Sequence, residues 1–246
     1  MRVCRTGNFR LIMEAIILAG GMGIRLKPVI ENIPKCMAPV AGKPFLYYLL
    51  STLESSGFRH IILSLGYKYE IIESWLKEYK TSIPITLVAE DIPLGTGGGV
   101  KFAMSKATQT SVFVLNGDSY IGLDYQNLYK FHNEKQALAT IALKQMFRFD
   151  RYGKVEINDE SRIIGFGEKQ YCDAGFINAG VYVINRNALE KFSDKFSLEK
   201  DFFVPEASTG RLAGFQTNGY FIDIGIPEDY FRVQNDFSNG IPESDF

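Results

Sequence analysis

Three closely spaced glycines and an arginine lie near the start of the chain, in the segment LAGGMGIRL, residues 18–26. Two lysines follow in the segment IPKCMAPVAGKPF, residues 33–45. Glycines let backbone N–H groups approach an anion without a Cβ in the way, and successive N–H groups form an anion-binding nest. Arg25 offers a guanidinium fork that matches phosphate oxygens, while Lys35 and Lys43 add positive charge. These residues could form a phosphate cradle, and a glycine-rich surface turn with solvated basic residues fits them equally well.

Two familiar glycine motifs do not fit this segment. A GxGxxG pattern that starts at Gly21 would end at Leu26, and no acidic residue stands at the right distance to bind a ribose 2′-hydroxyl. The P-loop pattern GxxxxGK[ST] occurs nowhere in the chain. The sequence therefore predicts neither a dinucleotide-binding loop nor a P-loop.

Strands and helices are predicted to alternate along the first half of the chain. Four short apolar runs are typical of strands buried on both faces: 15–19, 60–65, 85–89 and 112–116. Four helices are predicted to follow them in turn: 44–57, 69–79, 97–107 and 125–135. This rhythm predicts a parallel sheet with helices on both faces, and ligands of such sheets bind beyond the carboxyl ends of the strands. Three unusual loops follow strands at that edge: 20–43, 90–99 and 116–119.

The second half of the chain is richer in strands, which are longer and partly antiparallel. We expect them over 137–146, 154–157, 162–169 and 176–185, with a last helix from Pro227. The predicted fold class is α/β: a Rossmann-like mixed sheet, parallel in its N-terminal half and flanked by helices, with a smaller sheet or lid in the C-terminal half. One domain is expected over 13–240, with a tail at 241–246. Residues 1–12 are expected to be an extension, either mobile or preceding a natural start at Met13.

The composition limits the classes of function. Hydrophobic residues make up 46% of the 246 residues and charged residues 22%, which is ordinary for a soluble domain with a sizeable core. A net charge of −1 provides no general basic field for nucleic acid. Three cysteines without CxxC spacing argue against a zinc site and favour a reducing cytoplasm. No apolar run approaches the ~20 residues of a membrane span, and His60 and His132 are expected at the surface or at helix edges.

Further segments occur in a fixed order along the chain. They are EDIPLGTGGGV (90–100), VLNGDSYI (114–121), GFGEKQ (165–170), INAGVYVI (177–184) and GYFIDIGIPEDY (219–230). Together with the first loop they resemble the sugar-1-phosphate nucleotidyltransferases, whose opening pattern is GGxGTRLxPLT…PKxMxPVxGKP. The resemblance covers about residues 13–235 and implies the nucleotide-diphospho-sugar transferase fold. The departures are Ile24, where the family often has threonine, and Val29 with Ile30 in place of Leu-Thr.

The resemblance implies nucleotidyl transfer from a nucleoside triphosphate to a sugar 1-phosphate. A phosphate oxygen of the sugar 1-phosphate would attack the α-phosphorus in line, and pyrophosphate would leave. Because two anions must meet, the site needs cations and alignment rather than a protein nucleophile. Arg25 would hold the leaving phosphates and Lys35 the transferring one. The implied nucleotide-binding residues are Leu18, Ala19, Gly20, Gly21, Gly23, Arg25, Glu90, Gly95, Thr96 and Asn116.

The resemblance also implies a metal and a sugar-phosphate site. Asp118 and Asp223 would bind Mg²⁺, a hard cation that prefers oxygen ligands. Lys169 would hold the sugar's phosphate and, with Arg25, Lys35 and Asp118, complete the catalytic set. The implied sugar-phosphate-binding residues are Gly117, Glu168, Lys169, Asn178 and Gly180. Plainer interpretations of the same residues are a turn aspartate, solvated basic side chains and polar strand residues that face solvent.

Glu90 is the residue that bears on the nucleobase. A carboxylate only accepts hydrogen bonds. Guanine presents paired N1–H and N2–H donors, whereas uracil and thymine present one N3–H between two carbonyls, so an acid near the base favours guanine. The same residue could be an ordinary carboxylate at the end of a strand. GTP is therefore the favoured nucleotide.

Short family members with PLGTGG and GYFIDIGIPEDY look most like the guanylyltransferases of D-glycero-α-D-manno-heptose 1-phosphate. That sugar phosphate is the favoured second substrate, and a bacterial surface glycan the expected destination of its product. The alternatives are a mannose-1-phosphate guanylyltransferase, a uridylyltransferase for N-acetylmuramate or glucose 1-phosphate, and a non-catalytic homologue that senses nucleotides. A monomer and a homodimer both fit the sequence.

Overall fold

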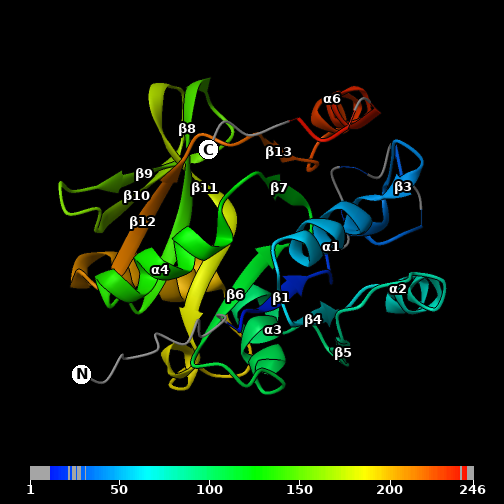
Figure 1. The fold of residues 1–246 in the computed structure, drawn as a ribbon. Helices are drawn as coiled ribbons and strands as arrows, with labels where there is room; N and C mark the ends of the chain where they lie inside the picture. The colour runs from blue at the N-terminus through cyan, green and yellow to red at the C-terminus, as the bar shows by residue number, and fades with distance from the viewer. Residues whose placement is uncertain are drawn as a thin grey trace, which may run out of the picture.

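A mixed sheet of nine strands forms the centre of the molecule (Figure 1). The structure is a computed structural model that describes residues 12–21, 23, 26, 29–30, 32–238 and 240–242. The sheet has the order β10-β9-β11-β6-β1-β4-β5, and β8 pairs with β11 and β12. Its strands are β1 (Glu14–Leu18), β4 (His60–Leu65), β5 (Ile85–Ala89), β6 (Ser111–Asn116), β8 (Ala139–Phe149), β9 (Gly153–Ile157), β10 (Ile163–Lys169), β11 (Cys172–Asn185) and β12 (Leu212–Thr217).

The first half of the sheet is parallel. Strand β1 lies between β4 and β6 and runs parallel to both, and β5 runs parallel to β4 on the outside. The intervening helices are α1 (Phe45–Ser55), α2 (Tyr69–Leu76) and α3 (Gly95–Met104), and α4 (Tyr125–Lys135) follows β6 and the short β7 (Ser119–Ile121). The carboxyl ends of β1, β4, β5 and β6 therefore meet at one edge, as the sequence predicts.

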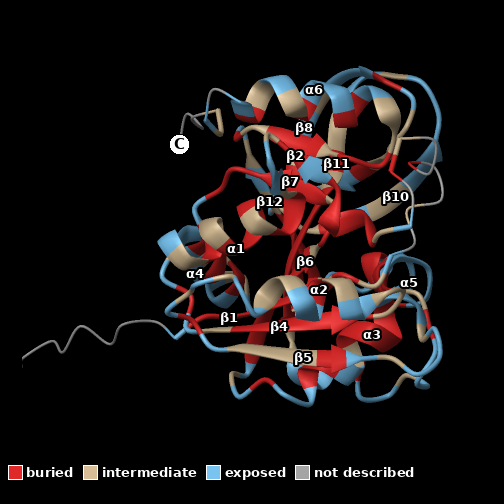
Figure 2. Cartoon of the chain, turned by 90° about the vertical axis from the view of Figure 1, so that its right-hand side faces the viewer, coloured by how far each residue is buried: buried red, intermediate tan, exposed pale blue. Residues whose placement is uncertain are grey.

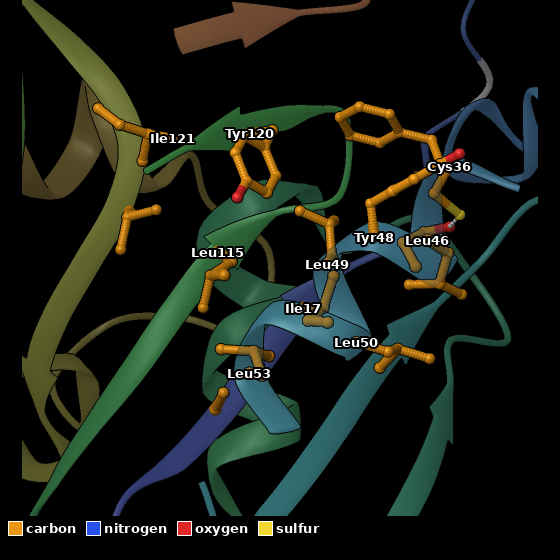
Figure 3. Close-up of a cluster of buried hydrophobic side chains, with 14 of the residues drawn as sticks. Ile17, Cys36, Leu46, Tyr48, Leu49, Leu50, Leu53, Leu115, Tyr120 and Ile121 are labelled. Carbon is orange, nitrogen blue, oxygen red and sulfur yellow. Dashed lines mark hydrogen bonds between the residues drawn. The ribbon is translucent and has the colours of Figure 1, made fainter. Parts of the chain in front are cut away.

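Side chains at alternate positions of the strands pack into two separate hydrophobic cores, one on each face of the sheet. Ile17 of β1 and Leu115 of β6 belong to the core under α1, whereas Ile16 and Val114 belong to the core under α3. Figure 3 shows Leu46, Leu49, Leu50 and Leu53 of α1 beside Ile17 and Leu115. These strands are buried on both faces (Figure 2), which explains why they read as continuous apolar runs.

The strands of the second half continue the same sheet. Strand β11 runs antiparallel to β6 and β8, and β12 returns parallel to β8. The α/β class with a parallel N-terminal half is confirmed, but most C-terminal strands extend the central sheet instead of forming a sheet of their own. Two small two-stranded sheets stand apart: β7 pairs with β13 (Phe221–Asp223), and β2 (Pro39–Val40) pairs with β3 (Lys43–Pro44). The last helix is α6 (Pro227–Ser238).

Two predictions from the sequence differ from the structure: the start of one helix and the exposure of one histidine. Helix α3 begins at Gly95, inside the predicted loop, and Glu90 Oε2 accepts a hydrogen bond from Leu94 N at 2.9 Å just before the helix. His132 was expected at an edge and is buried instead, at 2% exposure. Its ring nitrogens contact Thr140 Oγ1 and Asn185 Oδ1, at 2.9 and 3.0 Å, which satisfies both inside the fold.

Short helices complete the described part of the chain. They are η2 (Lys35–Met37), η3 (Arg186–Leu189), the π-helix η4 (Leu198–Phe203), α5 (Val204–Glu206) and η5 (Ala207–Thr209). Within the described residues, no helix has the length and apolar character that crossing a membrane requires. Leu198, Phe202 and Phe203 of η4 pack with α3 in the second core.

Candidate active site

Two neighbouring cavities open at the carboxyl edge of the parallel strands. The first cavity has a volume of about 420 Å³ and is lined by Leu18, Ala19, Gly20, Gly21, Lys35, Cys36, Ser64, Glu90, Pro93, Gly95, Thr96, Asn116, Gly117, Asp118, Tyr182, Ser197, Leu198 and Glu199. The second cavity, of about 370 Å³, is lined by Asn116, Ser119, Arg151, Tyr152, Gly153, Val155, Phe166, Gly167, Glu168, Lys169, Asn178, Glu199, Lys200, Phe203, Val204, Phe221 and Asp223. Asn116 and Glu199 line both, so the cavities adjoin.

The first cavity exists because the chain turns sharply where β1 and β6 end side by side. Leu18 pairs with Asn116 in the sheet, and Gly117 N donates to Leu18 O at 3.0 Å just beyond. A Cβ on Gly117 would lie 2.4 Å from that carbonyl oxygen, so only glycine lets the two backbones come this close. The turn brings the NGD segment beside the first loop.

Asp118 and Asp223 are brought together by pairing of β7 with β13. Asp223 lies opposite Ser119 in that pair, and Ile224 N donates to Asp118 O at 3.0 Å. Gly225 N donates to Asp223 Oδ1 at 2.7 Å and fixes the orientation of this carboxylate. Two residues that are far apart in the sequence therefore face one small volume.

Lys35 lies between these two carboxylates. Its Nζ is 2.5 Å from Asp118 Oδ2 and 3.5 Å from Asp223 Oδ1, and its side chain is 9% exposed. The lysine is held by the short helix η2, with Lys35 N donating to Gly21 O at 3.4 Å, and its aliphatic stem runs past Gly23. Among the described residues, one ammonium thus contacts both carboxylates, and the two acidic groups are crowded around it.

Burial and this crowding both affect the titration of Asp223. Burial and the neighbouring Asp118 raise the pKa of Asp223 above its usual range, although Lys35 acts in the opposite direction. Cys36 lies next to Lys35 in the chain, and burial with the Asp118 charge raises the pKa of its thiol to about 12. The thiol therefore stays protonated near neutral pH and serves as a packing residue.

Glu90 faces the first cavity and is held against the start of α3. Its Oε2 accepts the hydrogen bond from Leu94 N, and its Oε1 lies so close to Gly99 that a Cβ there would be 2.5 Å away. The carboxylate is thereby fixed in position at the end of β5. A ligand group in the cavity would meet a preoriented hydrogen-bond acceptor.

The glycine run of α3 forms a seat for the segment 192–200. Gly97 N and Gly98 N donate to Phe196 O at 3.0 and 3.3 Å, and Thr96 Oγ1 accepts from Leu198 N at 2.9 Å. A Cβ on Gly97 would lie 2.3 Å from the Phe196 ring. These backbone groups bind another part of the chain, and in doing so they carry Glu199 to the border of both cavities.

The second cavity combines acidic, basic and amide side chains. Glu168 and Lys169 come from the end of β10, and Asn178 comes from β11. Asn178 Oδ1 accepts from Gly180 N at 2.9 Å and Asn178 Nδ2 donates to Tyr182 Oη at 3.0 Å, across an irregularity in the pairing of β11 with β8. The amide keeps one lone pair and one N–H for a ligand.

The structure places most residues implied by the sequence in one cavity or the other. Those in the first are Leu18, Ala19, Gly20, Gly21, Lys35, Glu90, Gly95, Thr96, Asn116, Gly117 and Asp118, and those in the second are Asn116, Glu168, Lys169, Asn178 and Asp223. Gly117 was assigned to the sugar phosphate and lines the first cavity instead. Gly23 and Gly180 line neither; they pack against the side chains of Lys35 and Asn116. Arg25 and Ile24 lie outside the described residues.

Several lining residues have no signal in the sequence. Tyr182 lies on a buried strand, Glu199 and Lys200 lie on η4, and Arg151 lies in the turn between β8 and β9. None belongs to a spacing pattern that indicates a ligand. Their position depends on the seating of η4 against α3 and on the pairing of β11 with β6, which are tertiary contacts.

Comparison with known proteins agrees with this geometry. The family model described as nucleotidyl transferase matches residues 14–240. The chain is 44% identical to the D-glycero-alpha-D-manno-heptose 1-phosphate guanylyltransferase of Aneurinibacillus thermoaerophilus over 93% of this chain and 100% of the relative. It is 40% identical to the protein of the same name from Campylobacter jejuni, over 89% and 98% respectively.

The fold has a close match among solved structures. The crystal structure of HddC from Yersinia pseudotuberculosis complexed with GMP-PN superposes with a TM-score of 0.84 at 39% identity. The match covers 92% of this chain and all of that one. With a family model that spans nearly the whole described chain and two relatives of 44% and 40% identity, the chain belongs to the nucleotidyl transferase family.

Proposed function

We propose that the chain condenses GTP with D-glycero-α-D-manno-heptose 1-phosphate to give GDP-heptose and pyrophosphate. The observation that carries this proposal is the Lys35, Asp118 and Asp223 cluster, where the two adjoining cavities meet. Two relatives named for this activity match nearly the whole chain, and HddC was solved with GMP-PN. The cavities offer one compartment for each substrate.

The cluster suits a divalent cation. Asp118 and Asp223 supply hard oxygen ligands, and both lie within 3.5 Å of the Lys35 ammonium, so their carboxylates face one small volume. Mg²⁺ keeps waters and shares phosphate oxygens, so two carboxylates are enough for a protein to hold it with a nucleotide. Bound Mg²⁺ would supply neutralisation of the phosphate charge.

We assign Lys35 to the transferring phosphate. Its side chain lines the first cavity and contacts Asp118, close to the second cavity, and we expect the α-phosphate of a bound triphosphate to meet the sugar phosphate there. An oxygen of the sugar 1-phosphate forms a new bond to the α-phosphorus, the bond from the α-phosphorus to the bridging oxygen breaks, and the electron pair leaves with pyrophosphate. Lys35 would stabilise negative charge that develops at the α-phosphate during this exchange.

Glu90 supports guanine as the base. Its carboxylate is fixed at the wall of the first cavity by Leu94 N and accepts hydrogen bonds only. Guanine matches such an acceptor with two adjacent N–H donors, whereas uracil matches it with one. In the second cavity, Glu168 and Asn178 would bind sugar hydroxyls and Lys169 the sugar's phosphate.

The proposal is tested by a panel of substrates. GTP, ATP, CTP, UTP and dTTP are each incubated with Mg²⁺ and with heptose, mannose or glucose 1-phosphate or N-acetylmuramate 1-phosphate, and pyrophosphate release is timed. We expect the fastest turnover with GTP and the heptose phosphate. Faster turnover with UTP would reject the base assignment, and faster turnover with mannose 1-phosphate would reject the sugar assignment.

The proposed activity also implies where the enzyme works and what its product is used for. We place the enzyme in a reducing cytoplasm, which is consistent with Cys36 and Cys172 as free thiols in the described structure. The product would supply activated heptose to a surface glycan. Cell fractionation with an antibody to the chain tests the location.

A further inference from the structure

Arg151 lines the second cavity and has no role in the reaction described so far. It lies in the turn between β8 and β9, and its neighbours along the cavity wall include Lys169 and Asp223. Its guanidinium lies over the ring of Tyr152, 5.5 Å from the centroid. The same cavity is proposed to receive the sugar 1-phosphate, so Arg151 is a candidate to bind that anion.

Arg151 forms an ion pair with Asp229. Arg151 Nη1 donates to Asp229 Oδ2 at 2.6 Å, while Arg232 Nη2 lies 3.2 Å from Asp229 Oδ1. The Asp229 side chain is 10% exposed, whereas that of Arg151 is 36% exposed. The buried carboxylate therefore anchors one corner of the guanidinium, and within the described residues the other N–H groups of Arg151 make no hydrogen bond.

The charges along the cavity show what Arg151 is available to bind. Lys35 contacts Asp118 and Asp223 and is assigned to the transferring phosphate, so the phosphate of the sugar needs other cations. A sugar 1-phosphate carries between one and two negative charges near neutral pH, and Lys169 offers a single point charge. Arg151 adds a planar fork whose geometry matches two oxygens of one phosphate.

The position of Arg151 also relates it to the reacting centre. Arg151 and Asp223 line the same cavity, and Asp223 Oδ1 lies 3.5 Å from Lys35 Nζ. A phosphate bound by Arg151 would lie on the sugar side of the metal-binding carboxylates, opposite the first cavity.

We propose that Arg151 binds the phosphate of the sugar 1-phosphate with the free edge of its guanidinium, and that Asp229 is the positioning residue that aims it into the second cavity. The inference rests on the function proposed above. Two phosphate oxygens held by the fork leave the third directed at the α-phosphorus. That oxygen forms the new P–O bond while the pyrophosphate leaves with the electron pair, so Arg151 acts by orientation and exchanges no proton.

The decisive variant is Arg151→Lys, which keeps the charge and removes the fork. Charged hydrogen bonds are worth about 1.5–3 kcal/mol, so we expect the KM for the sugar 1-phosphate to rise about 10- to 100-fold. The KM for GTP should stay within about twofold, because Arg151 does not line the first cavity. The melting temperature should be nearly unchanged.

Asp229→Asn and Arg232→Ala form a matched pair around the same carboxylate. Asp229→Asn keeps the side-chain shape but weakens the hold on Arg151, and we expect a smaller rise of about 3- to 10-fold in the sugar 1-phosphate KM. Arg232 contacts the other oxygen of Asp229 and lines neither cavity. Arg232→Ala should leave both KM values unchanged.

A binding measurement separates this inference from the proposed function. Calorimetry with a non-hydrolysable GTP analogue, Mg²⁺ and the best sugar 1-phosphate of the panel should give weaker sugar-phosphate binding for Arg151→Lys and unchanged binding for Arg232→Ala. Unchanged sugar-phosphate KM and affinity in an active, folded Arg151→Lys variant would overturn the role of Arg151. A loss of stability with no change of KM would mean that the Arg151–Asp229 ion pair only links α6 to the turn between β8 and β9. If the wild type transfers no nucleotide to any sugar phosphate, the proposed function itself fails.

Discussion

The carboxylates at the two ends of strand β1 differ in the partners that the fold gives them. At the amino end, Glu14 is 3% exposed and accepts hydrogen bonds from Thr108 N at 2.6 Å, Gln109 N at 2.7 Å and Thr108 Oγ1 at 3.1 Å, and its Oε1 lies 3.1 Å from His60 Nδ1. Beyond the carboxyl end, Asp118 and Asp223 share the single ammonium of Lys35. Several donors from the fold surround the first carboxylate, whereas the second pair is crowded around one ammonium.

The difference shows in the direction of the pKa shifts. Burial of Glu14 acts to raise its pKa, but the hydrogen bonds from Gln109, Thr108 and His60 outweigh burial and lower it. Burial and Asp118 raise the pKa of Asp223. A carboxylate that the fold satisfies stabilises the fold, whereas a crowded pair costs stability until a ligand brings positive charge. The contrast separates a structural end of the sheet from a functional one.

The largest effect is expected at Lys35. Lys35→Ala removes the cation that is presented to the transferring phosphate, and we expect kcat to fall by about 10²- to 10³-fold. Lys43→Ala is the matched control, because Lys43 lies over the Tyr47 ring, 4.9 Å from the centroid, and lines neither cavity. Single-turnover pyrophosphate release measures both. Equal losses in the two variants would mean that the Lys35 charge acts only through the general field of the protein.

Substituting the crowded carboxylate should separate activity from stability. Asp223→Asn keeps an oxygen that can accept from Gly225 N but removes the charge that repels Asp118. We expect kcat to fall by about 10²-fold or more, as for loss of another preorganised charge at a transition state. The melting temperature of the metal-free protein at neutral pH should rise. A lower melting temperature would show that the Asp223–Lys35 contact outweighs the repulsion.

The satisfied carboxylate should give the opposite result. Glu14→Gln replaces charge-assisted hydrogen bonds from Thr108 N and Gln109 N with neutral ones and places an amide among the same partners. We expect a loss of about 1–3 kcal/mol in the free energy of unfolding. The KM values should be unchanged because Glu14 lines neither cavity. Denaturant titration and steady-state kinetics on the same preparation check both, and a large fall in kcat would contradict the separation of the two ends.

The sequence predicts one side of this contrast better than the other. Apolar runs and parallel crossovers predict that segments after β1, β5 and β6 meet at one edge, and they do. The resemblance points to Lys35, Asp118 and Asp223, which the structure brings together. Their catalytic and metal-binding roles stay predictions.

What the sequence misses depends on long-range packing. Arg151 and Glu199 reach the cavities through the β8–β9 turn and through the seat of η4 on α3, and no local period encodes either contact. The buried network of Glu14 with the 108–109 turn is equally invisible, since a single acid at the start of a strand reads as an exposed residue. His132 was misplaced for the same reason: its partners Thr140 and Asn185 come from strands of the second half.

The smallest and sharpest test is the dependence of stability on pH. The folded-state pKa of Glu14 lies below its usual 4.5, so its stabilisation is complete above the unfolded-state value and is lost as the pH falls through the folded value. The folded-state pKa of Asp223 lies above its usual 3.8, so its penalty is complete above that raised value and is relieved as the pH falls through it. The two groups therefore contribute to stability with opposite signs.

Unfolding titrations of wild type, Glu14→Gln and Asp223→Asn in metal-free buffer from pH 8 to pH 3 resolve the two contributions. At neutral pH, Asp223→Asn should be more stable than the wild type and Glu14→Gln less stable. On acidification both differences should shrink, that of Asp223→Asn as the pH falls through the raised pKa of Asp223 and that of Glu14→Gln as it falls through the lowered pKa of Glu14. Added Mg²⁺ should stabilise the wild type at neutral pH and Asp223→Asn less, since the variant lacks one of the two carboxylates. If both variants instead follow the same pH curve, the two ends of β1 do not differ in how they hold charge.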